Sequence, residues 1–310
     1  MKKIALLLLV GAAVPALAQR GEPAFVVQER GEGYDSLQDA VDAIGGGGGT
    51  IVIAPGRYRQ CAVQEGGAVA YVAAEAGTAI LDGGICEGKA ALVLRGRSAR
   101  IVGLTFQNLR VADGNGAGIR IEDGDLAIAE TLFRDSQSGI LSRDDYDDAI
   151  HIERSTFSGL GRCDGDNACA HSIYVGEDTD LSIVRSRFER GTGGHYVKSR
   201  GPAIEVLDSS FDDSGGRTTN YMIDLPYGAT GTIARNVFVQ GKDKENYSAL
   251  IMVAAEGVEH SSEGLAIFGN DASLAPGMDS GTAFVADESG DALRIGDNRL
   301  GPKIRRFEKR

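Results

Sequence analysis

The sequence predicts an all-β fold, a parallel β-solenoid, and three observations lead to this prediction. A frame of a branched apolar residue, a small polar residue and a Phe returns every 23 to 34 residues. The apolar residues of each frame alternate as they do in a strand. Glycine is abundant, at 44 residues, and Trp is absent, which suits short strands joined by tight turns. One copy cannot bury its apolar face alone, so the copies must stack.

The complete frames define the core that we expect. Their apolar residues should be buried in one continuous stack, with the small polar residue in the turn between two strands. The five complete frames are Ile128/Thr131/Phe133, Ile152/Ser155/Phe157, Ile183/Ser186/Phe188, Val206/Ser209/Phe211 and Ile233/Asn236/Phe238. Partial copies keep some of the same positions: Ile101 with Phe106, Ile267 with Asn270, and Ile295 with Asn298.

The first 18 residues have the pattern of a secretory signal. Lys2 and Lys3 precede an apolar run over residues 4–14, and Ala16-Leu17-Ala18 stands before Gln19. This pattern predicts cleavage after Ala18 and export, to the periplasm or the medium. The run is too short to span a bilayer, so no membrane insertion is expected. Removal of two lysines takes the formal net charge from −12 to −14, which argues against nucleic acid and anionic membranes as partners.

A capping element precedes the first strand. Residues 37–44 place Leu37, Ala40, Val41 and Ile44 on one helical face, and Ser36 stands at the N-cap position. A glycine run, 45–49, ends this helix, and the strand 50–54 follows with a turn at Pro55-Gly56. Such a helix can cover the open apolar end of a solenoid.

Four cysteines in an exported chain favour disulfides. Cys163 and Cys169 close a short loop, which leaves Cys61 to pair with Cys86. Neither pair has the second Cys or His couple that a zinc site requires, so no metal is assigned to them.

The capping helix, the GTIVIAPGRYR turn and the frames resemble a right-handed parallel β-helix of the pectate-lyase-like superfamily. The similarity covers residues 25–302, which leaves residues 303–310 as a basic tail. That superfamily includes lyases, hydrolases, esterases, epimerases and binding proteins, so it implies a fold more than an activity. The stretches HSIYVGED, GGHYVKSR and NYMIDLPYG also resemble a family of exported bacterial β-helix proteins without an assured activity.

Stacking of the coils places the charged, tyrosine and histidine side chains close together. Aligning the strands on Ile119, Ile140, Ile173, Val197 and Ile223 puts the next residue of each in one outward column. Equivalent residues of a parallel stack lie about 4.8 Å apart, so the members of the column should be neighbours. The column is Arg120, Leu141, Tyr174, Lys198 and Asp224, with Arg143 and Arg200 two residues further along their strands and His171, His195 and Tyr221 three residues before it.

The segment 181–200 is basic on an acidic chain, with five cationic residues and one acidic residue. An excess of this kind is either a solvated face or a docking point for an anion. Two His, three Tyr, one Lys and two Arg converge on adjacent coils. This convergence favours chemistry on an acidic sugar, although the His residues also suit the core and Lys198 with Asp224 also suits a surface ion pair.

Eliminative cleavage of a uronate-containing polysaccharide is the reaction that these residue types suit best. Arg200 with Arg143 would pair with the substrate carboxylate, since guanidinium binds carboxylate bidentately. Lys198 is the expected base, because nearby guanidinium groups favour its neutral form, and His195 is its rival. Tyr174 or His171 would be the acid. We expect the remaining candidates to contact the substrate: Arg120, Tyr196, Tyr221 and Asp224.

Two other functions remain open at this point. A non-catalytic glycan-binding or envelope protein would use the same basic groove. Glycoside hydrolysis needs two carboxylates, and the column offers only Asp224, with Glu256 placed to reach the rim after the apolar strand 249–255. The acidic loops 144–148 and 164–167 are possible Ca²⁺ ligands without EF-hand spacing, and solvated turns are the alternative. The sequence does not indicate an oligomeric state.

Overall fold

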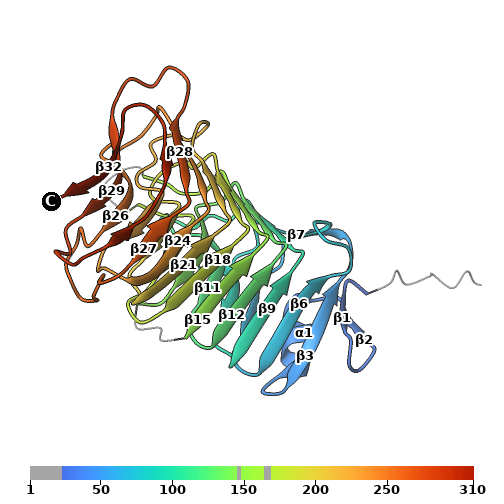
Figure 1. The fold of residues 1–310 in the computed structure, drawn as a ribbon. Coiled ribbons are helices and arrows are strands. Elements are labelled where there is room, and N and C mark those ends of the chain that lie inside the picture. The colour runs from blue at the N-terminus through green and yellow to red at the C-terminus, as the bar shows by residue number, and fades with distance from the viewer. Residues whose placement is uncertain (1–22, 145–147, 164–168) are drawn as a thin grey trace, which may run out of the picture.

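The computed structural model describes residues 23–144, 148–163 and 169–310, and these residues form a right-handed parallel β-solenoid of about nine turns. Figure 1 shows the turns stacked along one axis, from the blue N-terminal end to the red C-terminal end. The fold class predicted from the frames is therefore confirmed. The signal expected over residues 1–18 lies outside the described residues.

The strands of the described residues form three sheets, which we call A, B and C. Sheet A has twelve strands: β2 (Glu32–Tyr34), β1 (Phe25–Val27), β3 (Gly48–Ile53), β6 (Ala68–Ala73), β9 (Ser98–Val102), β12 (Asp125–Ala129), β15 (Ala149–Glu153), β18 (Asp180–Val184), β21 (Ala203–Leu207), β24 (Thr230–Ala234), β27 (Ala266–Phe268) and β30 (Arg294–Ile295). Its first two strands pair antiparallel and the others pair parallel.

Sheets B and C have ten strands each among the described residues. Sheet B contains β4 (Gly56–Tyr58), β7 (Ala79–Asp82), β10 (Thr105–Gln107), β13 (Leu132–Arg134), β16 (Thr156–Ser158), β19 (Arg187–Glu189), β22 (Ser210–Asp212), β25 (Val237–Gln240), β28 (Asp271–Leu274) and β31 (Arg299–Leu300). Sheet C contains β5 (Ala62–Gln64), β8 (Ala90–Leu94), β11 (Ala117–Ile121), β14 (Ser138–Ser142), β17 (Ile173–Val175), β20 (Val197–Ser199), β23 (Ile223–Leu225), β26 (Ala249–Val253), β29 (Thr282–Asp287) and β32 (Ile304–Lys309). The tail from residue 304 thus forms the last strand of sheet C, paired with β29.

The core fills the space between the three sheets, and a stack of Phe rings runs along it. Neighbouring rings have centroids 4.7 to 5.0 Å apart and nearly parallel planes. This spacing equals the strand repeat, because each ring rests on the equivalent ring of the next coil. The stack is Phe106, Phe133, Phe157, Phe188, Phe211 and Phe238, and these rings are at most 1% exposed. The Ile and Val residues of the five frames are buried as well.

The small polar residue of each frame has a structural role in the turn from sheet A to sheet B. Ser155 Oγ accepts a hydrogen bond from the backbone N–H of Thr131 on the preceding coil, at 3.2 Å. Ser186, Ser209 and Asn236 continue the same pattern from coil to coil. A buried N–H without an acceptor is costly, so this ladder explains why the frame carries a hydroxyl or an amide at this position.

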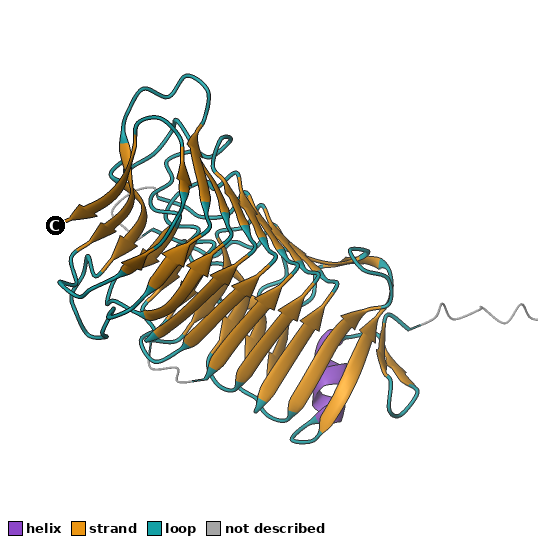
Figure 2. Cartoon of the chain, viewed as in Figure 1, coloured by secondary structure: helices purple, strands orange, loops and turns teal. Residues whose placement is uncertain are grey.

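The N-terminal end of the solenoid is closed by the helix α1 (Leu37–Ile44), drawn in purple in Figure 2. Ser36 accepts a hydrogen bond from the N–H of Asp39 at its N-terminus. The buried face of α1 is the predicted one, with Leu37, Ala40, Val41 and Ile44. Both predicted disulfides are present, Cys61–Cys86 and Cys163–Cys169.

Candidate functional site

The outward column of sheet C has the register that the sequence predicted. Arg120 on β11 stands beside Leu141 on β14, which stands beside Tyr174 on β17. Lys198 on β20 follows Tyr174, and Asp224 on β23 follows Lys198. Stacking of equivalent residues therefore brings four polar side chains from separate coils to one face.

A pocket of about 330 Å³ opens on this face. Five of the predicted site residues line it: Arg120, His171, Tyr174, Lys198 and Arg200. The Arg120 guanidinium donates to the carbonyl oxygen of Ser142 at 2.9 Å. The pocket thus has a cationic wall with an aromatic hydroxyl and an imidazole, which suits an anionic ligand.

Lys198 is almost completely buried and stands between two carboxylates. Its Nζ lies 2.5 Å from Glu256 Oε1 and 3.6 Å from Asp224 Oδ2. Burial is the main cause that raises the pKa of Asp224 to about 7, and the positive charge of Lys198 opposes it. Within the described residues, Asp224 Oδ1 has no hydrogen-bond partner. Asp224 is therefore a carboxyl group that gains and loses its proton near neutral pH.

Glu256 reaches this site from the turn after β26, about one full coil beyond Asp224. One of its oxygens contacts Lys198 and the other contacts the Arg200 guanidinium. Burial opposes ionisation of Glu256, but the hydrogen bonds from these two cations outweigh it and lower its pKa. The Glu256 carboxylate is therefore bound between Lys198 and Arg200 in this structure.

Arg200 also organises the aromatic side of the pocket. It donates to the hydroxyl of Tyr174, and its guanidinium carbon lies 5.1 Å from the ring centroids of both Tyr174 and Tyr227. The Tyr174 hydroxyl donates in turn to Asp144 at 2.9 Å. Burial, the largest cause, raises the pKa of Tyr174, so its hydroxyl stays protonated.

The two histidines of the site stack on each other, with ring centroids 4.9 Å apart, and His195 also stacks on Tyr221, with centroids 5.4 Å apart. His171 Nδ1 accepts the backbone N–H of His195 at 3.0 Å, and His195 Nδ1 accepts that of Tyr221 at 3.1 Å. Each ring therefore carries its proton on Nε2. Burial is the main cause that lowers the pKa of His171 to about 3 and the pKa of His195 well below its usual value. Both rings are neutral N–H donors, and neither Nδ1 is free to accept a proton.

Three residues that we predicted to contact the substrate do not line the pocket. Tyr196 points into the core, is 1% exposed and donates its hydroxyl to Asp213 at 2.7 Å, so it cannot contact a substrate. Strand alternation would turn Tyr196 outward, because it is next to the inward Val197, but Tyr196 precedes β20 and lies in the turn, where alternation does not apply. Arg143 is exposed in the loop after β14 and does not line the pocket, although its chain neighbours Ser142 and Asp144 do. Tyr221 lies beneath His195 and supports its ring.

Two residues of the site, Asp144 and Tyr227, were not predicted from the sequence. Asp144 stood inside an acidic loop that was considered only for Ca²⁺. Tyr227 comes directly after Pro226, in the turn that leaves β23. Both lie in turns, where strand alternation predicts no direction for a side chain.

No protein-family model and no curated protein matches the chain. Two solved structures resemble it. ORF18 of Geobacillus virus E2 has a TM-score of 0.48 and 13% identity over 89% of this chain, which spans 57% of the viral protein. The Streptococcus pneumoniae surface protein and adhesin PfbA has a TM-score of 0.37 and 9% identity, over 88% of this chain and 94% of PfbA. Both scores lie below 0.5, so we assign no function from either protein.

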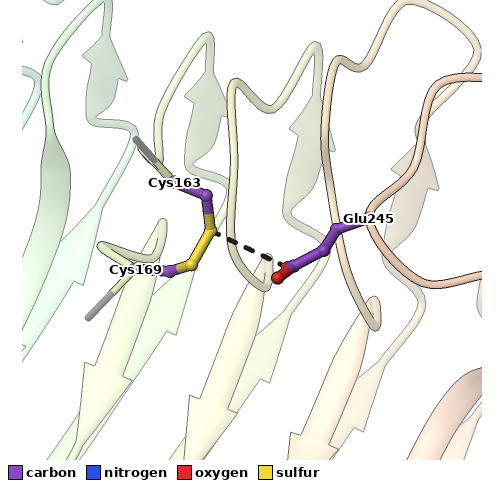
Figure 3. A group of neighbouring side chains, drawn as sticks. All are labelled: Cys163, Cys169 and Glu245. Carbon is purple, nitrogen blue, oxygen red and sulfur yellow. Dashed lines mark hydrogen bonds between the residues drawn. A yellow bond between two sulfur atoms is a disulfide. The ribbon is translucent and has the colours of Figure 1, made fainter. Parts of the chain in front are cut away.

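One group of potential metal ligands occurs within the described residues, and Figure 3 shows it: Cys163, Cys169 and Glu245. The two sulfur atoms are bonded to each other, and Glu245 Oε2 lies 3.8 Å from Cys163 Sγ. A disulfide offers no thiolate, so this group does not suit a metal while it is oxidised. The two acidic loops considered for Ca²⁺ lie largely outside the described residues.

No helix in the described part of the chain is long and apolar enough to cross a membrane.

Proposed function

We propose that this chain is an exported carbohydrate-active enzyme of the pectate-lyase-like superfamily, a polysaccharide lyase that cleaves a uronate-containing polysaccharide by β-elimination in the sheet C pocket. The fold, the two disulfides and the cationic pocket support this proposal. Export rests on the signal pattern of residues 1–18 and on the disulfides.

One observation carries the proposal: the carboxylate of Glu256 bridges Lys198 and Arg200 at the edge of the pocket. Lys198 lies on β20 and Arg200 directly follows the end of this strand, and both present their charges to one side, because both contact Glu256. A geometry that holds the protein's own carboxylate will also hold the carboxylate of a uronic acid. The substrate would displace Glu256 and leave its own carboxylate on Arg200.

The reaction then assigns one role to each neighbour. Binding of the carboxylate to Arg200 acidifies the adjacent C5–H. Lys198 takes that proton, the C4–O bond breaks, and a double bond forms between C4 and C5. Tyr174, which stays protonated, gives its proton to the leaving oxygen. Asp224 Oδ2 lies 3.6 Å from Lys198 Nζ and helps to hold the lysine in place beside the substrate. His171, which lines the pocket, would donate the N–H at its Nε2 to the sugar.

Glycoside hydrolysis is the second candidate, and a separate observation favours it. The two carboxyl groups beside Lys198 have pKa values shifted apart, Asp224 to about 7 and Glu256 downward. A pair with this difference can divide the roles of acid and base. The buried position of Asp224, 2% exposed, places it behind Lys198 and makes direct contact with a glycosidic oxygen less favourable.

The test is incubation of the purified mature protein with a set of uronate polysaccharides. A lyase produces a C4–C5 double bond that absorbs in the ultraviolet, together with new reducing ends. A hydrolase produces reducing ends without that absorbance. Binding to a polysaccharide without either product would identify the non-catalytic alternative and exclude the lyase for that polymer.

A further inference from the structure

A second and larger hollow lies outside the site, along the turns that lead from sheet B to sheet C. Its volume is about 880 Å³, and residues of five successive coils line it, from the turn after β10 to the turn after β22. Four steps of about 4.8 Å give a length of roughly 19 Å along the solenoid axis. A hollow of this shape suits an extended chain better than a compact ligand.

The lining of this groove is basic, although the whole chain has a net charge of −12. Four arginines line it, Arg110, Arg162, Arg190 and Arg217, against the single carboxylate of Asp135. Within the described residues, Arg110 and Arg217 form no ion pair. Arg190 donates to Ser158 and lies 3.8 Å from Glu189, with 59% of its side chain exposed. The guanidinium groups of Arg110, Arg190 and Arg217 are therefore available to bind the oxyanions of a ligand.

The groove and the sheet C pocket are separated by one disulfide. Cys163 lines the groove and Cys169 lines the pocket, and the two are bonded to each other. Figure 3 shows both residues at the edge of the same coil. A polymer bound in the groove is therefore held close to the pocket, which raises its local concentration there.

We propose that this groove is an accessory binding surface for an acidic polysaccharide, which it recognises through carboxylates spaced along an extended glycan chain. The choice of a uronate polymer as ligand rests on the proposed function of the pocket. The groove binds the chain in stretches that are not being cleaved, and the pocket acts on a neighbouring unit. Its contribution is electrostatic, so it weakens as salt rises.

The experiment measures binding apart from cleavage, in a Lys198→Ala background. Fluorescently labelled polygalacturonate and alginate are the probes, labelled dextran is the neutral control, and anisotropy gives the Kd at low and high salt. The groove variant is Arg110→Ala/Arg190→Ala/Arg217→Ala. The matched control, Arg185→Ala/Arg235→Ala/Arg299→Ala, removes the same charge from exposed arginines elsewhere. A milder variant, Arg110→Ser/Arg217→Ser, leaves Arg190 and its contact with Ser158 in place.

The groove variant should bind at least one of the two uronate polymers about tenfold more weakly at low salt, and the control within about twofold of its parent. The milder variant should lose affinity severalfold. Equal losses in groove and control variants, unchanged affinity in the groove variant, or equal binding of dextran would overturn the proposal. Absence of binding to both polymers would overturn it as well. If binding behaves as expected but the wild type cleaves neither polymer, the groove assignment stands and the lyase assignment fails for these polymers.

Discussion

The outer faces of sheet A and sheet C have the same strand register but different chemistry. His151, in the middle of sheet A, is exposed, and its neighbours Ser182 and Glu205 form a single exposed hydrogen bond. His195, beside sheet C, is 9% exposed and stacks between two other rings. Two histidines of one solenoid thus differ in environment because only the second is covered by neighbouring turns.

This difference shows that the repeat determines where equivalent side chains lie, whereas the turns determine how deeply those side chains are buried. Parallel stacking brings equivalent side chains together on each sheet with equal regularity. Within the described residues, Lys198 and Asp224 of the sheet C column are buried, and a turn brings Glu256 to Lys198. Burial then shifts pKa values and strengthens charge interactions, which an exposed face cannot do. The candidate site therefore lies on the face that the turns enclose.

The largest effect is expected in the core that both faces share. Phe188→Ala should lower the free energy of unfolding by about 3 to 5 kcal/mol, because it leaves a gap in a continuous ring stack. Glu205→Ala, on the exposed face of sheet A, should change it by less than about 0.5 kcal/mol. Denaturant unfolding of both variants measures this, and equal effects would contradict the ring stack as the main source of stability.

Lys198→Ala should lower kcat by at least about 100-fold on any uronate polymer that the wild type cleaves. Lys198→Arg separates two roles: a carboxylate-binding cation should partly survive it, whereas a base should not, because guanidinium stays protonated. His151→Ala is the control, a histidine on the open face whose loss should leave turnover unchanged. Full activity of Lys198→Ala would exclude this lysine from the chemistry.

Asp224 should make stability depend on pH. Its folded pKa, about 7, lies above the unfolded value of about 4, so the folded state holds this proton more tightly. The resulting stabilisation is complete below about pH 4 and is lost as pH rises through about 7. Asp224→Asn should remove this dependence, on the order of 2 kcal/mol, since coupling to Lys198 and Glu256 spreads the shift. Unfolding measured from pH 4 to 8, with Glu205→Gln as control, tests it; parallel profiles for wild type and Asp224→Asn would contradict it.

Glu256→Gln gives the smallest expected change and distinguishes the two candidate reactions. Without the competing carboxylate, a lyase should bind a uronate substrate about fivefold more tightly, seen as a lower KM with kcat retained. A hydrolase that uses Glu256 as base or nucleophile should instead lose kcat by about 100-fold or more. Steady-state kinetics on one polymer decide between them, and an unchanged KM together with an unchanged kcat would mean that Glu256 does not occupy the substrate site.

The sequence by itself determined the periodic part of this protein. Alternation and the frame spacing predicted the inward Phe stack and the column from Arg120 to Asp224, which repeat from coil to coil. The capping helix was predicted from its own apolar face and N-cap, and the two disulfides from the number and spacing of the cysteines.

The tertiary structure decided what the column can do. Glu256 meets Lys198 across 58 residues of sequence through a turn that no repeat specifies. The inward course of Tyr196, the Nδ1 acceptors of His171 and His195 and the raised pKa of Asp224 all follow from the path of such turns. A strand fixes the direction of its side chains, but a turn does not. Burial, which sets the charge state of each group, depends on which turns cover it.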